Sequence, residues 1–409
     1  MDKKPEKLVP EVRFKGFTDD WEQRKLGDVV NFFSGLTYHP SDVKNKGYFV
    51  IRSSNIQNNQ IVSADDIFVN KDIINVPNVK QGDIIVVVRN GSRKLIGKHA
   101  QVLTDMPNTV IGAFMTGVRS KSNFYINALL DSDQFQKEIY KNLGATINQI
   151  TIGEFRKMRF IITSGNEAQT IGEFFKKIDT LITLQQRKLE QLKQLKKAML
   201  QQLFVDKNNK QPTLRFKNFK GDWKQHRLGE ISTKVTTKNQ SNASLPVFTN
   251  SAKDGIVNQE KFFDKQIANN TSNYYVVNNN DFVYNPRISK NAPFGPIRRN
   301  TLNKTGIMSP LYYIFSLSHN TDENFLSFYF LSSKWYKFMY ENGDSGARSD
   351  RFAIKDKVFQ QMPIKLPLII EQTEIGKFLN YVNILISLQQ TKLTQLTTLK
   401  KYLLQKMFI

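Results

Sequence analysis

The segment GSRKLIGKH, which begins at Gly91, combines glycine with basic residues as a phosphate-binding loop does. A P-loop has Gly, four residues and then Gly-Lys-Ser/Thr. Here five residues separate Gly91 from Gly97, and His99 stands in the place of the metal-binding hydroxyl. The spacing therefore argues against a nucleotide site. It favours a basic loop that faces a polyanion. The cations of this loop are Arg89, Arg93, Lys94 and Lys98.

No other stretch has a recognisable catalytic spacing. NPRI at Asn285 resembles only in part the Asn/Asp-Pro-Pro-aromatic loop with which adenine methyltransferases hold a flipped base, because it has one proline and an arginine. No GxGxxG cofactor loop precedes it. The chain has no cysteine, and its 4 His lie far apart without metal-ligand spacing. We expect no catalytic residue, no cofactor and no metal site.

The charge of the chain indicates the class of its partner. Its 409 residues carry 59 Lys and Arg against 36 Asp and Glu, a formal charge of +23. A chain this basic most often binds nucleic acid, although a genome rich in Lys and Asn codons gives a similar composition. No apolar run is long enough to span a bilayer, and no apolar stretch follows the charged start MDKKPEKLVP. We therefore expect a cytoplasmic protein without a membrane partner.

The loops must be positioned by a framework that the chain contains twice. RFKGFTDDWEQRKLG begins at Arg13, and RFKNFKGDWKQHRLG begins at Arg215. IGEFFKKIDTLITLQQRKLEQLKQLKKAMLQQLFV (171–205) likewise parallels IGKFLNYVNILISLQQTKLTQLTTLKKYLLQKMFI (375–409). The segments between match only faintly, for example at Arg89 and Arg287. Two halves with one framework and diverged interiors are predicted.

Apolar residues spaced three and four apart predict a long helix with a heptad seam at the end of each half. The first seam comprises Ile178, Ile182, Gln185, Leu189, Leu192, Lys196, Met199 and Leu203. The second comprises Val382, Ile386, Gln389, Leu393, Leu396, Lys400, Leu403 and Met407. Gly172 and Gly376 interrupt both helices at a cost of about 1 kcal/mol each, which suggests close packing there.

Helices of roughly 50 Å with matching seams should pair. An antiparallel pair lets the first helix lead into the second half while the second helix ends the chain. Gln185 and Gln389 either help to fix the register or are solvated edge positions.

The interior of each half predicts mixed α/β structure. The expected strands are 84–89, 110–118 and 159–162 in the first half, and 282–285, 307–315 and 363–366 in the second. Helices are expected over 124–142 and 324–341. The fold class is therefore α+β, with two mixed α/β domains in internal repeat joined by an antiparallel coiled coil. We place the domains at 1–165 and 206–369, the latter including a linker, and the helices at 166–205 and 370–409.

This pattern resembles the specificity subunit of type I restriction–modification systems. The resemblance covers the whole chain and rests on the two opening phrases and the helix endings QLKQLKKAMLQQLFV and QLTTLKKYLLQKMFI. The family's PxxxEQ-like lead into the helix is clear in PLIIEQ (367–372) and degraded in SGNEAQ (164–169). A non-restriction DNA-binding scaffold or regulator with an internal two-fold repeat is the alternative, and an orphan methyltransferase is a weaker one.

The resemblance implies two target recognition domains, each of which reads one half of a split site in double-stranded DNA. The paired helices would set the spacing of the half-sites and bind two methyltransferase (modification) subunits, which carry S-adenosylmethionine chemistry. Restriction/translocase subunits would join indirectly, and the chain itself would perform no reaction. Because the two interiors differ, the site should be asymmetric.

Residues that read bases are expected to be polar or basic and to lie on loops. In the first domain the candidates are Arg52, Ser53, Asn55, Arg89, Asn90, Arg93, Lys94, Lys98, Asn148 and Gln149. In the second they are Thr249, Asn250, Arg287, Lys290, Arg348, Asp350 and Arg351. For each cation, a phosphate contact or plain solvation is the alternative. Trp21 and Trp223, in the opening phrases, are expected to anchor the cores.

Overall fold

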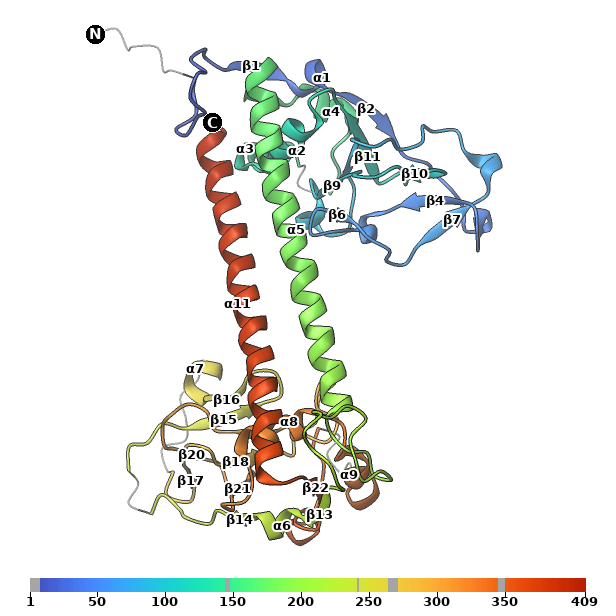
Figure 1. Ribbon diagram of the computed structural model, residues 1–409. Helices are drawn as coiled ribbons and strands as arrows, with labels where there is room; N and C mark the ends of the chain where they lie inside the picture. Colours follow the sequence, from blue (N-terminus) through green and yellow to red (C-terminus); the bar gives the residue numbers. More distant parts are fainter. Residues whose placement is uncertain (1–7, 144–147, 241–242, 264–270, 345–349) are drawn as a thin grey trace, which may run out of the picture. The chain divides into compact units, whose positions relative to one another are not determined.

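A computed structural model describes residues 8–143, 148–240, 243–263, 271–344 and 350–409 (Figure 1). The chain divides into two compact units. Unit 1 comprises Met1–Gln186 with Thr391–Ile409, and unit 2 comprises Arg187–Gln390. Within the described ranges, no helix is both long and apolar enough to cross a membrane.

Unit 1 is built on a four-stranded antiparallel sheet. Its order is β2 (Asn31–Ser34), β11 (Met115–Arg119), β8 (Ile84–Val87) and β9 (His99–Gln101). The β8 sequence IIVV is buried at every position, as β-branched residues in a strand covered on both faces are. A second sheet has the order β10 (Thr109–Ile111), β4 (Tyr48–Ile51), β7 (Ile67–Val69) and β3 (Val43–Lys44), with β10 parallel to β4.

Smaller elements complete unit 1. Strand β1 (Glu22–Lys25) pairs with β12 (Arg159–Ile162), and β5 (Ile56–Gln57) pairs with β6 (Gln60–Ile61). The short helices are α1 (Leu26–Val29), α2 (Asn123–Asp131), α3 (Asp133–Asn142) and α4 (Ile152–Lys157).

Unit 2 repeats the four-stranded antiparallel sheet of unit 1 but not its second four-stranded sheet. The repeated sheet has the order β14 (Ser232–Lys234), β21 (Tyr313–Leu317), β18 (Phe282–Tyr284) and β19 (Ile297–Arg299). The second sheet is replaced by two hydrogen-bonded pairs, β15 (Phe248–Ser251) with β16 (Gly255–Asn258) and β17 (Tyr275–Val277) with β20 (Gly306–Met308). Strand β13 (Lys224–Arg227) pairs with β22 (Pro363–Leu366) as β1 does with β12. The short helices are α6 (Leu228–Ile231), α7 (Gln259–Phe263), α8 (Glu323–Leu331), α9 (Tyr336–Asn342) and α10 (Asp356–Phe359).

Four predicted elements are wrong because each is two elements. The strand predicted over 110–118 is β10 and β11, and that over 307–315 is β20 and β21. The helix predicted over 124–142 is α2 and α3, because Ser132 ends the first helix and its hydroxyl accepts a bond from Phe135 N to cap the next. The helix predicted over 324–341 is likewise α8 and α9, interrupted after the buried Ser332.

The two long helices are α5 (Gly165–Gln202) and α11 (Ile369–Met407). Each predicted seam residue is buried or half-buried, whereas Leu181, Leu184 and Leu388 beside the seam are 47%, 53% and 62% exposed. In unit 1, Phe175 of α5 lies 6.0 Å from Phe408, ring centroid to centroid, and Asp179 lies 2.5 Å from Lys400. Asp179 comes after Phe175 along α5, whereas its partner Lys400 comes before Phe408 along α11. The two helices are therefore antiparallel in unit 1.

Each core is completed by the chain segment that ends the other half. In unit 1, the ring of Phe408 packs against Trp21 and Tyr125 at 6.0 Å and 5.6 Å. In unit 2, Phe204 packs at 5.1 Å against Phe325, which also contacts Trp223. Trp21 and Trp223 are 2% and 4% exposed, which confirms that they are core anchors.

The repeated opening phrase braces the start of each long helix. Arg13 Nε lies 2.6 Å from Glu167 of α5, and Trp21 Nε1 donates to the same carboxylate at 3.1 Å. The bonds from Arg13 and Thr163 outweigh burial and lower the pKa of Glu167. In unit 2, Arg215 Nε donates to Glu371 of α11 at 2.7 Å, and Trp223 Nε1 lies 3.4 Å from it. The phrase thus has a structural role.

A buried ionic cluster fastens α11 within unit 1. Lys400 Nζ lies 2.6 Å from Asp131 of α2 and 2.5 Å from Asp179 of α5. Burial alone would raise the pKa of Asp131, but His99 and Lys400 together lower it. Burial opposes the charge on Lys400, and the two carboxylates nevertheless raise its pKa. Lys196, which occupies the same seam position in α5, has no ion-pair partner among the described residues, and burial followed by the charge of Arg298 lowers its pKa.

Replacing Gly172 with Ala is expected to lower the stability of unit 1 by about 1–3 kcal/mol. A Cβ at this position would lie 2.6 Å from Tyr125 N, so the backbone of α2 would have to move. Gly153 in α4 is the matched control, because the nearest atom to its added Cβ is 3.7 Å away. Gly153→Ala should stabilise by up to about 1 kcal/mol through helix propensity. Urea unfolding distinguishes the two signs, and equal effects would contradict the packing argument.

Candidate nucleic-acid interface

The sequence-predicted loops of unit 1 come together after strand β8. Asn90 donates from Nδ2 to Ser53 Oγ at 3.1 Å, and Asn148 donates from Nδ2 to Gly91 O at 3.1 Å. Arg89 and Gln149 form an isolated antiparallel bridge. Segments around residues 52, 90 and 148 therefore form one polar face, which we call loop face 1. Its members are Arg52, Ser53, Arg89–Lys94, Asn148 and Gln149.

The cations of loop face 1 differ in how tightly they are held. Arg52 donates from Nη2 to Asp65 Oδ2 at 2.7 Å, which occupies one side of its guanidinium. The guanidinium carbon of Arg89 stands 5.0 Å from the ring centroid of Phe114, a side chain that is 54% exposed. A cation–π contact of this kind leaves the N–H donors of the guanidinium available. Arg93 and Lys94 are exposed, and Lys98 is half-buried.

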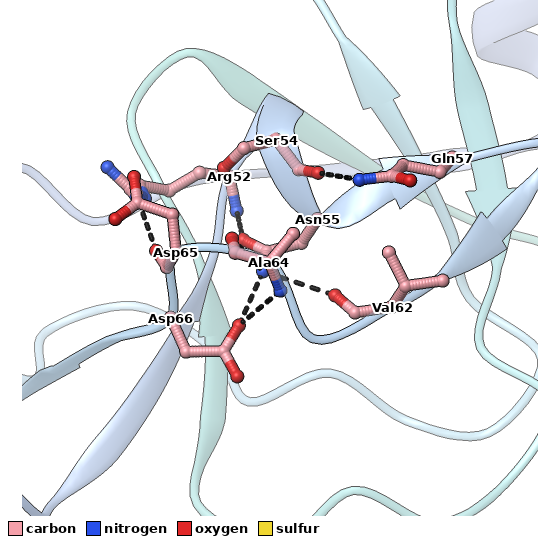
Figure 2. Close-up of polar contacts among 8 residues, drawn as sticks. All are labelled: Arg52, Ser54, Asn55, Gln57, Val62, Ala64, Asp65 and Asp66. Atoms are coloured by element: carbon pink, nitrogen blue, oxygen red, sulfur yellow. Dashed lines mark hydrogen bonds and ion pairs between the residues drawn. The ribbon is translucent and has the colours of Figure 1, made fainter. Parts of the chain in front are cut away.

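Asn55, also among the expected readers, lies beneath loop face 1 and not on it. Its side chain is fully buried, and Nδ2 donates to Val62 O at 3.2 Å, Ala64 O at 3.1 Å and Asp66 Oδ1 at 2.7 Å. Figure 2 shows these bonds beside the ion pair of Arg52 with Asp65. Asn55 shapes the loop from inside, and a buried amide with occupied donors has nothing left to offer a ligand.

The corresponding loops of unit 2 also converge, in a second polar face that we call loop face 2. Arg287 and Arg351 form an isolated antiparallel bridge, and Asn285 Nδ2 donates to Asn250 O at 2.8 Å. Arg287 Nη2 lies 3.7 Å from Asp350 Oδ2, and both side chains are at least half exposed. Lys290 is exposed nearby along the chain. Loop face 2 comprises Arg287, Lys290, Asp350 and Arg351, and the predicted Arg348 lies outside the described residues.

Thr249 and Asn250, which we expect among the readers of unit 2, have almost completely buried side chains. Thr249 is 6% exposed with its hydroxyl 3.0 Å from Tyr312 Oη. Asn250 is 2% exposed, and its Nδ2 donates to Val283 O at 2.7 Å and Pro296 O at 3.1 Å. Both side chains hold neighbouring loops together beneath the surface.

Loop face 2 borders two hollows with aromatic walls. One, of about 500 Å³, is lined by Arg287 and Arg351 together with Phe263 and Tyr312. The other, of about 880 Å³, lies between Arg351, Lys234 and Tyr284. The bond to Asp356 raises the pKa of Lys234, so the hollow presents a cation, while burial raises the pKa of Tyr284, whose hydroxyl is buried. These aromatic residues and Phe114 were not among the predicted site residues, because an isolated Phe or Tyr in the sequence is more often a core residue.

The side chains of both faces are suited to binding a ligand by hydrogen bonds and charge. Exposed guanidinium, ammonium and amide groups, backed by exposed or half-buried aromatic rings, match phosphate oxygens and base edges. Among the described residues, no group of three or more His, Asp or Glu is placed to hold a metal ion.

Comparison with known proteins adds an independent line of evidence. The family model described as type I restriction modification DNA specificity domain matches twice, at residues 18–194 and 220–398. The type I restriction enzyme StySPI specificity subunit of Salmonella potsdam is 28% identical over 195 residues, which cover 45% of this chain and 41% of that protein. The MjaVIII specificity subunit of Methanocaldococcus jannaschii is 26% identical over 200 residues, which cover 46% of each chain. The chain therefore spans less than half the length of either of these relatives.

Solved structures share the fold of the whole chain. The S subunit of a type I restriction–modification system from M. genitalium superposes with a TM-score of 0.62, at 14% identity, over 98% of this chain and 99% of its own. A chain from a structural study of complex assembly in a type I system superposes with a TM-score of 0.52 at 16% identity.

Proposed function

Because the chain belongs to the family of type I restriction modification DNA specificity domains, we propose that it is a specificity subunit that reads an asymmetric, two-part site in double-stranded DNA. Unit 1 reads one half-site through loop face 1, and unit 2 reads the other through loop face 2. The observation that carries this proposal is that one sheet framework presents two different polar faces at equivalent loops. Identical faces would read the same bases and predict a palindrome.

The chain performs no reaction in this proposal. Two modification subunits bind the paired helices α5 and α11 and supply methyl transfer, and restriction/translocase subunits join through them. Exposed apolar side chains on α11 support such contacts, among them Tyr381, Ile384 and Leu388 at 59%, 55% and 62% exposure. The site of action is the cytoplasm. A basic scaffold outside restriction is disfavoured because the family model matches both halves.

Genome-wide mapping of adenine methylation, with and without the gene, tests the proposal. We expect one bipartite motif to disappear when the gene is deleted and to return when it is restored. The purified chain alone, mixed with S-adenosylmethionine and DNA that contains this motif, should transfer no methyl group, and adding the modification subunits should start the transfer. Methylation by the chain alone would favour an orphan methyltransferase. An unchanged methylome would contradict the proposal.

A further inference from the structure

The two loop faces contain one structurally equivalent pair of residues with different chemistry. Strands β8 and β18 hold the same place in their sheets, and each leads into an isolated antiparallel bridge, Arg89 with Gln149 in unit 1 and Arg287 with Arg351 in unit 2. Gln149 in unit 1 thus occupies the position of Arg351 in unit 2.

The hydrogen bonds around each bridge confirm the equivalence. In unit 1, Asn90 N donates to Asn148 O at 3.2 Å, and Ile150 N donates to Val88 O at 2.9 Å. In unit 2, Ile288 N donates to Asp350 O at 3.0 Å, and Phe352 N donates to Pro286 O at 2.8 Å. The same backbone frame therefore holds Gln149 and Arg351, and what differs between the two positions is the side chain.

The side chains of Gln149 and Arg351 both have polar groups that are available to a ligand. Directly opposite residues of an antiparallel pair project to one face, so Gln149 stands beside Arg89, and Arg351 stands beside Arg287. Within the described part of the chain, neither the amide of Gln149 nor the guanidinium of Arg351 makes a hydrogen bond or an ion pair. Their neighbours are engaged, Asn148 with Gly91 O and Asp350 with Arg287.

The Arg287–Arg351 pair is unfavourable by itself. Like charges directly opposite each other across a strand pair are destabilising. The carboxylate of Asp350 lies 3.7 Å from Arg287, is half exposed and therefore screens little. The pair therefore gains from a ligand that brings two acceptors, and two backbone hydrogen bonds hold the segments of Arg287 and Arg351 together.

On the basis of the proposed function, we infer that Gln149 and Arg351 each determine one base pair of the respective half-site, A·T for Gln149 and G·C for Arg351. A guanidinium fork matches the two acceptors N7 and O6 of guanine, and a carboxamide matches the N7 acceptor and N6 donor of adenine. Phe114 under Arg89 and the aromatic hollow beside Arg351 shield the contacts from water. Arg89 and Arg287, common to both faces, bind the adjacent phosphates.

The experiment exchanges the guanidinium and the carboxamide between the two positions, in the complex assembled with its modification subunits. Binding is measured by competition on a panel of duplexes in which each base pair of the mapped site is replaced in turn. Arg351→Gln should move the preference at one position of one half-site from G·C to A·T, with a change in relative affinity on the order of 10- to 100-fold. Gln149→Arg should do the reverse in the other half-site. Each variant should leave the opposite half-site unchanged.

Arg351→Lys separates base reading from phosphate binding. A lysine keeps a phosphate contact but cannot form the bidentate contact to guanine, so we expect discrimination to fall at that one position. Lys224→Gln, which removes an exposed cation from β13, is the control for loss of charge and should leave every preference unchanged. Uniformly weaker binding of all duplexes by both exchange variants would overturn the inference. A wild-type complex that discriminates no half-site at all would instead refute the proposed function. The exchanges lie in different units, so one that fails to fold leaves the other to decide.

Discussion

Lys400→Met is expected to lower the free energy of unfolding of unit 1 by about 3–5 kcal/mol. Methionine keeps the unbranched shape of lysine but is one atom shorter, and the substitution removes the ammonium group together with its contacts to both carboxylates. It leaves the carboxylates of Asp131 and Asp179, whose side chains are 11% and 36% exposed, without the cation that lies 2.6 Å and 2.5 Å from them. A buried ion pair adds little beyond an apolar pair of the same shape, but removing one partner leaves the other charge undercompensated. Asp131 would keep only His99 at 3.3 Å and Asn59 Nδ2 at 2.6 Å.

Lys196→Met is the matched control that the internal repeat provides. Lys196 occupies the same seam position in α5, but burial and Arg298 already lower its pKa, and the described residues give it no carboxylate. Removing this charge should be neutral or stabilise unit 2. Hydrogen exchange followed by mass spectrometry reports the units separately. We expect Lys400→Met to reduce protection in α2 and in the last turns of α11, and Lys196→Met to reduce it nowhere.

A double variant completes the test. Asp131 ends α2 where Leu331 ends α8, so unit 2 shows that an apolar residue fits this position of the framework. Adding Asp131→Leu to Lys400→Met should restore part of the lost stability, because it removes one of the stranded carboxylates. If the stability losses of Lys400→Met and Asp131→Leu simply added up in the double variant, Lys400 and Asp131 would not be energetically coupled.

The internal repeat allows the helical framework to be predicted from the sequence. It does not allow the contact partners of the repeated residues to be predicted. The periodic apolar positions predict α5 and α11 well, because this periodicity is local in the sequence and does not depend on contacts with distant residues. Arg13 and Trp21 recur as Arg215 and Trp223, which indicates a shared role but not the partner. That partner is the glutamate of the helix leads SGNEAQ and PLIIEQ, far away along the chain.

The binding loops were harder to predict residue by residue. Arg, Asn, Ser and Thr were selected for their donors and acceptors, and the same groups stabilise loops from inside. Asn55 and Asn250 are such cases, and nothing local in the sequence distinguishes them from Asn90 or Asn148. The equivalence of Gln149 and Arg351 depends on backbone bridges that a sequence with strongly diverged interiors does not reveal.

Glu371→Ala is expected to cost unit 2 about 3 kcal/mol, near the lower end of the range for a broken buried pair. Its carboxylate is 2% exposed and accepts from Arg215 Nε at 2.7 Å and Nη2 at 2.8 Å. The indole of Trp223 loses its acceptor at the same time. Arg215 would keep its bonds to the carbonyls of Lys220 and Gly221, which limits the loss.

Glu374, three residues further along α11, provides the control. It pairs with Lys377 at 3.2 Å, but both side chains are at least half exposed, so Glu374→Ala should cost no more than about 0.5 kcal/mol. Urea unfolding of both variants gives the comparison. If the opening phrase braces the helix start, Glu371→Ala should also expose the indole of Trp223 to a fluorescence quencher, while Glu374→Ala should not. Equal costs for the two substitutions would mean that the repeated Arg and Trp do not depend on this carboxylate, and the brace would have to lie in the packing of Phe216 against Phe378.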